Sequence, residues 1–109
     1  MSNMIQAARE QVAALTQAAY EKAAAEGLLP AGAEVKATIE IPKDVTHGDY
    51  ASSFAMAGAK ALRKAPRQIA EVIVSHLDLA GTFFDKVEIA GPGFLNFTLG
   101  SKWYGLSLI

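Results

Sequence analysis

The stretch HGDYASSFAMAGAKALRKAPR, residues 47–67, is the part of the sequence around which the fold is organised. Gly48 permits a tight entry into this stretch. Asp49 is expected to cap a helix, because its carboxylate can accept the free N–H groups of the first turn. At helical spacing one face carries Tyr50, Phe54, Ala61 and Leu62. The opposite face ends in a basic cluster and carries Ser53, Met56, Lys60, Arg63 and Lys64.

Positive charge is concentrated in the same stretch. Residues 43–67 carry five basic and two acidic side chains, whereas the whole chain has 10 basic and 11 acidic groups and a formal net charge of −1. No global field therefore draws the chain toward nucleic acid, but a local patch of this kind can contact phosphates. A solvated helix face, with cations suited to a helix C-terminus, is the alternative explanation of the charge pattern.

The composition fits one soluble globular domain. The chain has 109 residues, of which 51% are hydrophobic and 19% charged. It contains no cysteine, which excludes disulfides and thiolate metal sites. No apolar run approaches the ~20 residues of a membrane span, and the N-terminus does not read as a signal peptide. We therefore expect a cytoplasmic protein.

Hydrophobic spacing predicts the remaining elements. A helix is expected over residues 2–26, with the apolar stripe Ile5, Ala8, Val12, Leu15 and Ala19. Period-two alternation predicts strands over 34–41, 83–90 and 94–99, and an amphipathic helix is expected to begin at Pro66. Residues 90–93, Ala-Gly-Pro-Gly, have the chemistry of a hairpin turn. This order favours an α+β fold, a small and mainly antiparallel β-sheet with helices on one face, preceded by an N-terminal helix.

The sequence offers no catalytic set. His47 and His76 are the two histidines, and His76 falls on the apolar stripe of its helix, where a packed histidine is favoured over a ligand. His47 lies beside Asp49, but no nucleophile signature accompanies them. From the residues we expect a binding domain without a catalytic, cofactor or metal site.

Three blocks of the sequence, residues 39–63, 65–70 and 87–97, resemble the N-terminal additional domain of arginyl-tRNA synthetase in the same order. The resemblance implies a single N-terminal tRNA-recognition domain, residues 1–109, of a larger synthetase. It implies two partners, the D-loop at the outer corner of tRNA(Arg) and the rest of the synthetase chain. The catalytic and anticodon-binding domains, and the HIGH and KMSKS motifs that serve ATP and magnesium, belong to that missing part.

The resemblance also implies an RNA-binding set. Tyr50 matches the aromatic residue of the family's GDY motif, and a tyrosine can stack on an unpaired base. Ser53 stands where many members have asparagine, and Met56 follows one turn later. Further along the chain, candidate phosphate contacts are provided by Lys60, Lys64 and Arg67. No DNA or membrane partner is implied, and a monomer is expected. The alternative is a structural or protein-interaction module that docks on the rest of its parent protein.

Overall fold

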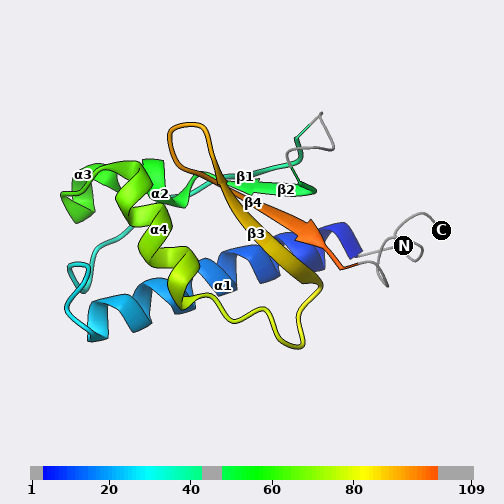
Figure 1. Ribbon diagram of the computed structural model, residues 1–109, viewed down its shortest axis with the longest axis horizontal. Helices are drawn as coiled ribbons and strands as arrows, with labels where there is room; N and C mark the ends of the chain where they lie inside the picture. Colours follow the sequence, from blue (N-terminus) through cyan, green and yellow to red (C-terminus); the bar gives the residue numbers. More distant parts are fainter. Residues whose placement is uncertain (1–3, 43–47, 101–109) are drawn as a thin grey trace.

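The longest helix, α1 (Met4–Ala25), lies along a four-stranded β-sheet (Figure 1). The structure is a computed structural model and describes residues 4–42 and 48–100. Ala8, Val12 and Ala19 are buried, because at helical spacing they share the side of α1 that faces the rest of the domain. The predicted N-terminal helix is therefore confirmed.

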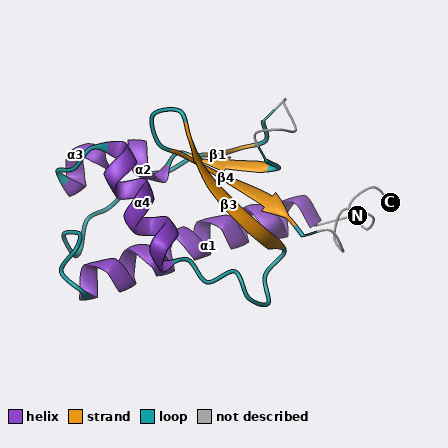
Figure 2. Cartoon of the chain, viewed as in Figure 1, coloured by secondary structure: helices purple, strands orange, loops and turns teal. Residues whose placement is uncertain are grey.

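The sheet has the order β1-β2-β4-β3, and all neighbouring strands are antiparallel. Its strands are β1 (Ile39–Glu40), β2 (Tyr50–Ser52), β3 (Phe84–Ala90) and β4 (Phe94–Leu99). Helix α1 contacts β1 and β2, and α4 (Pro66–His76) contacts β3 and β4, so together the two helices cover one face (Figure 2). The predicted α+β class, the helix from Pro66 and the β3–β4 hairpin are confirmed.

The core lies between this sheet face and the helices. The ring of Phe84 packs edge-on against Tyr50 and Phe97, with ring centroids 5.8 and 5.3 Å apart. Register explains the grouping, because Tyr50 pairs with Phe97 and Phe84 with Leu99, which places all four side chains on the same face. Below them α4 contributes buried Ile69, Ala70 and Ile73.

The prediction of a single central helix starting at Asp49 is wrong. Residues 50–52 form β2, and the helical part divides at Gly58 into α2 (Phe54–Ala57) and α3 (Ala59–Leu62). Asp49 does not cap a helix, because its Oδ2 atom accepts a hydrogen bond from the backbone N–H of Leu99 at 2.9 Å. Pairing with β4 has overridden the helical preference of this alanine-rich stretch.

The strand predicted over residues 34–41 is much shorter in the structure. Only Ile39 and Glu40 pair with β2, because β2 is itself three residues long and the chain then turns into α2. The N–H of Thr38 instead donates to the hydroxyl Oγ of Ser53 at 2.8 Å. Ile41, expected to point inward with Ile39, is 50% exposed. The polar residues 43–46 predict a loop, and Ser101 predicts the start of another helix, but both lie outside the described residues.

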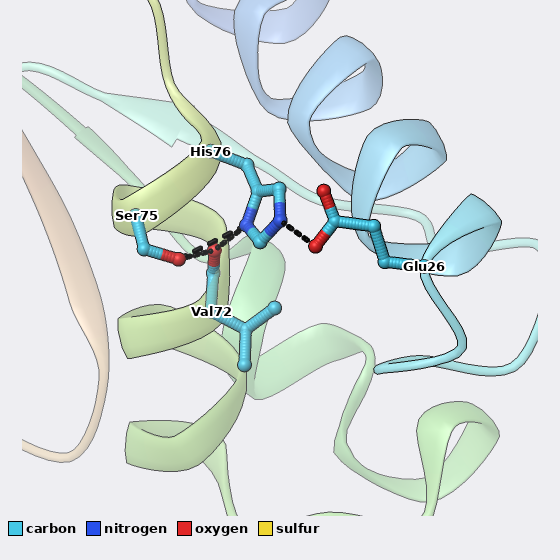
Figure 3. A network of polar contacts seen from close by, with 4 residues as sticks. All are labelled: Glu26, Val72, Ser75 and His76. Carbon is cyan, nitrogen blue, oxygen red and sulfur yellow. Dashed lines mark hydrogen bonds and ion pairs between the residues drawn. The ribbon is translucent and has the colours of Figure 1, made fainter.

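His76 joins the ends of α1 and α4 (Figure 3). Its Nε2 atom lies 2.9 Å from Oε1 of Glu26, and its Nδ1 atom lies 2.8 Å from the carbonyl oxygen of Val72 and 2.9 Å from Oγ of Ser75. The His76 side chain is 13% exposed, so the expectation of a packed histidine is confirmed. The hydrogen bonds to Glu26 and then to Val72 raise the pKa of His76, while burial and Lys22 lower it.

This contact makes stability depend on pH. Because the pKa of His76 is raised in the folded state, its stabilising effect is complete below the unfolded value near 6.5 and is lost as pH rises through the folded pKa. We expect Glu26→Gln to lower the thermal midpoint at pH 5.5 more than at pH 8.5. Gln17→Ala, on the exposed side of α1, is the control. An equal effect of Glu26→Gln at both pH values would contradict this account.

Candidate nucleic-acid interface

A pocket of about 310 Å³ lies on the sheet face opposite the core. Its floor is formed by Ala51 of β2 and Asn96 of β4, which are direct partners in the ladder. Glu40 follows on the next strand, opposite Ala51. The wall on the other side comes from the β3–β4 turn and the ring of Phe94. The full lining is Glu40, Pro42, Ala51, Ala90, Gly91, Pro92, Phe94 and Asn96.

Asn96 is the unusual residue of this pocket. It is only 6% exposed, and within the described ranges its side-chain amide has no hydrogen-bond partner in the protein. A buried amide without a partner costs roughly 1–3 kcal/mol, and most such groups in folded proteins are paired. An amide in the floor of a pocket can donate and accept hydrogen bonds with whatever occupies the pocket, whether solvent or a polar ligand.

Gly48 contributes to the burial of Asn96. A Cβ atom built on Gly48 would lie 3.3 Å from Cβ of Asn96 and 3.0 Å from the carbonyl oxygen of Phe97. The backbone of Gly48 therefore rests directly against β4, at a φ of +84° that favours glycine. This close approach covers the β-carbon of Asn96 on the sheet face opposite the core.

The lining is suited to a flat, neutral and polar-edged ligand. Phe94 offers an aromatic ring, and the amide of Asn96 offers a donor and an acceptor side by side. Unpaired RNA bases are bound by this combination of stacking and edge hydrogen bonds. None of the lining residues is basic, and Glu40 is acidic, which disfavours a phosphate inside the pocket. Its volume lies at the lower end of the range for small-ligand sites, about 300–1,000 Å³.

Tyr50 does not lie in this pocket. It is 5% exposed on the core face of β2. Burial of the Tyr50 side chain is the main cause that raises its pKa, the nearby Asp49 carboxylate raises it further, and Arg9 lowers it by less. The predicted stacking of a base on Tyr50 needs an exposed ring, and the structure corrects that expectation. The next residue, Ala51, reaches the pocket because side chains alternate along a strand.

Ser53 is engaged within the protein. Its hydroxyl accepts the Thr38 N–H and lies 3.0 Å from the Thr38 hydroxyl, while its own N–H donates to the Thr38 carbonyl at 3.0 Å. These bonds continue the β1–β2 pairing by one residue, so Ser53 holds β1 in place. Met56 is half-buried in α2, and its contact with RNA stays a prediction.

The three predicted phosphate contacts are exposed but not clustered together. Lys60 is on α3, and Lys64 lines a separate polar groove with Leu28, Gln68 and Glu71. Only Arg67 reaches the pocket, because its Nη1 atom donates to the carbonyl oxygen of Gly91 at 2.9 Å. The structure therefore brings one of the three cations to the pocket rim.

Phe94 and Asn96 line the pocket, although the sequence pattern predicts them only as residues of the hairpin strand 94–99. A signal was present, since asparagine is depleted in strands and here lies between the apolar residues Leu95 and Phe97. Its burial is not a local signal, because Asn96 is packed against Ala51 of β2 and near Gly48, which are both remote in sequence.

Among the residues that the structure describes, no group of His, Asp and Glu side chains is arranged to hold a metal ion. No helix in that part of the chain is both long and apolar enough to cross a membrane.

Sequence comparison links the chain to one family. A profile described as "Arginyl tRNA synthetase N terminal domain" matches residues 5–99. The chain is 43% identical over 103 residues to the arginine–tRNA ligase of Acetivibrio thermocellus, a match that covers 94% of this chain and 18% of that protein. It is 51% identical over 65 residues to the arginine–tRNA ligase of Bacillus subtilis, covering 60% of this chain and 12% of that protein. The chain thus spans less than a fifth of the length of these relatives.

A solved structure shares the fold. The arginyl-tRNA synthetase of Plasmodium falciparum matches 92% of this chain and 17% of its own chain with a TM-score of 0.68. The sequence identity is 18%, so this likeness concerns the arrangement of helices and strands and not the residues of the pocket.

Proposed function

Because the chain belongs to the family of arginyl tRNA synthetase N-terminal domains, we propose that it is a non-catalytic tRNA-binding domain that recognises the D-loop at the outer corner of tRNA(Arg). An unpaired D-loop base enters the pocket between β1 and the β3–β4 turn. It stacks on Phe94 and pairs its polar edge with the amide of Asn96. This role supports arginylation by the rest of the synthetase chain.

The observation that carries the proposal is the buried amide of Asn96, which has no hydrogen-bond partner among the residues that the structure describes. An apolar ligand would leave the amide unsatisfied, and a phosphate would meet Glu40 without a basic partner in the lining. A nucleobase presents donors and acceptors along one edge and a flat apolar face. It therefore satisfies both the amide and the ring of Phe94.

The exposed cations act on the backbone of the same RNA in this proposal. Lys60, Lys64 and Arg67 contact phosphates and supply a salt-dependent, sequence-independent part of the affinity. Met56 of α2 packs against the same RNA. Tyr50 and Ser53 act indirectly, since they hold β2 and β1, the strands that supply Ala51 and Glu40 to the pocket.

The remaining properties are assigned to the parent synthetase. ATP with magnesium is used by the catalytic part, which is the second partner of this domain, and the protein works in the cytoplasm as a monomer. The domain itself contributes neither a catalytic residue nor a cofactor site.

An NMR titration with tRNA(Arg) in ~50 mM salt tests the proposal, because phosphate contacts are least masked at low salt. We expect the side-chain NH₂ resonances of Asn96 to shift, together with the backbone amides of Ala51 and Phe94. Asn96→Ala is expected to weaken binding by about 10- to 100-fold, the cost of losing a bidentate contact to a base.

Thr98→Ala is the matched control. Thr98 lies two residues along β4 on the same sheet face and is absent from the pocket lining, so its variant should bind as the wild type does. Equal affinity of Asn96→Ala and Thr98→Ala would reject the pocket as the base site. No binding by the wild-type chain would favour the alternative, a module that docks on the rest of its protein.

A further inference from the structure

We infer that Arg67 is a positioning residue for the base pocket, which it serves by holding the β3–β4 turn in the shape that makes the pocket wall. This inference rests on the proposed function, because it concerns the selectivity of the same pocket. It assigns to Arg67 a role distinct from the phosphate contact considered above. The start of α4 contacts the turn in two ways.

The first part of that contact is polar. The guanidinium Nη1 atom of Arg67 donates to the carbonyl oxygen of Gly91 at 2.9 Å, and Gly91 is itself a pocket-lining residue. Within the turn, the N–H of Gly93 donates to the carbonyl oxygen of Ala90 at 3.2 Å. Gly91 and Pro92 are exposed, so the bond from Arg67 ties down the part of the wall that faces solvent.

The second part of the contact is steric. A Cβ atom on Gly93 would lie 3.0 Å from Cβ of Pro66 and 3.2 Å from its carbonyl oxygen. The backbone of Gly93, with φ at +143°, therefore touches the first residue of α4. The turn therefore contacts the start of α4 at both of its ends, through the backbone of Gly93 against Pro66 and through the hydrogen bond of Gly91 with Arg67.

Helix α4 is a rigid support for this arrangement. Its Ile69, Ala70 and Ile73 are buried in the core, so the backbone at Arg67 is fixed by packing. A glycine-rich turn has few conformational restraints of its own. The bond from Arg67 to Gly91 therefore transfers the rigidity of the helix to the pocket wall, and rigid walls are what allow a pocket to reject ligands of the wrong shape.

A comparison of Arg67→Met with Lys64→Met tests this inference. Both variants remove one exposed positive charge, but Lys64 lines the groove with Leu28 and is not part of the pocket lining. The probes are tRNA(Arg) transcripts that carry each of the four bases at each unpaired D-loop position. The measured quantity is base selectivity, the ratio of the tightest to the weakest dissociation constant, together with the salt dependence of binding.

We expect Arg67→Met to lower base selectivity by about 3- to 10-fold, the equivalent of one hydrogen bond. Lys64→Met should weaken every transcript equally, reduce the salt dependence and leave the selectivity unchanged. In the free protein, Arg67→Met should also shift the backbone amides of Gly91 and Gly93, whereas Lys64→Met should not. These shifts report on the turn without RNA.

Unchanged selectivity in Arg67→Met would overturn the inference, even if the salt dependence falls. The proposed function would then stand if Asn96→Ala still weakens binding. If neither the wild-type chain nor Asn96→Ala shows a preference among bases, the proposed function itself has failed. The two failures are therefore distinguishable in one set of titrations.

Discussion

Replacing Phe97 with alanine is expected to destabilise the domain by about 3–5 kcal/mol. The Phe97 side chain is fully buried, and its ring packs edge-on against Phe84 at 5.3 Å. Removing it leaves a cavity in the middle of the layer where β4 meets the helices, because Phe97 pairs with both Tyr50 and Val87. Urea unfolding followed by circular dichroism measures the loss.

Thr98→Ala is the control for this variant. Thr98 is the next residue along β4 and points to the opposite face, where it is half-buried. Its replacement should change the free energy of unfolding by less than ~1 kcal/mol, because no buried apolar contact is lost. A loss below ~1 kcal/mol in Phe97→Ala would mean that the two faces of the hairpin are exchanged.

Gly48→Ala is expected to cost about 2–4 kcal/mol, the sum of a strained backbone and an overpacked contact. Gly48 has φ at +84°, which an alanine adopts only with strain. In addition, the new methyl group would stand 3.0 Å from the carbonyl oxygen of Phe97. That oxygen already accepts the N–H of Asp49 at 2.8 Å, so it cannot move away without breaking the β2–β4 pairing.

Gly32→Ala separates the two contributions. Gly32 has nearly the same backbone angle, φ at +78°, but a Cβ atom built there meets nothing within 4 Å. Its replacement should therefore cost only the strain of the left-handed conformation, roughly 1–2 kcal/mol. Equal losses in the two variants, measured by chemical unfolding, would show that the contact of Gly48 with β4 carries no penalty.

Elements with a strong local pattern could be predicted from the sequence. Helix α4 begins at Pro66 and buries Ile69 and Ile73, as its amphipathic spacing indicated. The β3–β4 hairpin was also predictable, because alternation and the Gly-Pro-Gly turn are both local signals. In these segments the neighbours in sequence are also the neighbours that decide the structure.

The central stretch could not be predicted in the same way. Its alanine-rich composition favours a helix, but residues 50–52 form a strand that pairs with β4, which lies more than forty residues further along the chain. No local propensity contains that pairing. The part of the predicted strand that covers residues 34–38 does not form for a related reason, because its partner strand β2 is only three residues long.

The candidate site was harder to predict than the fold. The basic residues point to α3 and α4, whereas the pocket lies on the sheet, and α4 meets the pocket wall through Pro66 and Arg67. The base-stacking role of Tyr50 came from the family resemblance alone, and in the structure its ring packs against Phe84 in the core. A buried amide is recognisable only when the backbone that covers it is known.

The strand order β1-β2-β4-β3 also has a consequence for the kinetics of folding. The β3–β4 hairpin closes a short loop, whereas β2 can join β4 only after the intervening segment with α2, α3 and α4 has been brought back. The greater loop-closure entropy of that step makes it the slower one. Since Ala51 and Asn96 become neighbours only through that pairing, the floor of the pocket forms only when the two parts of the sheet meet.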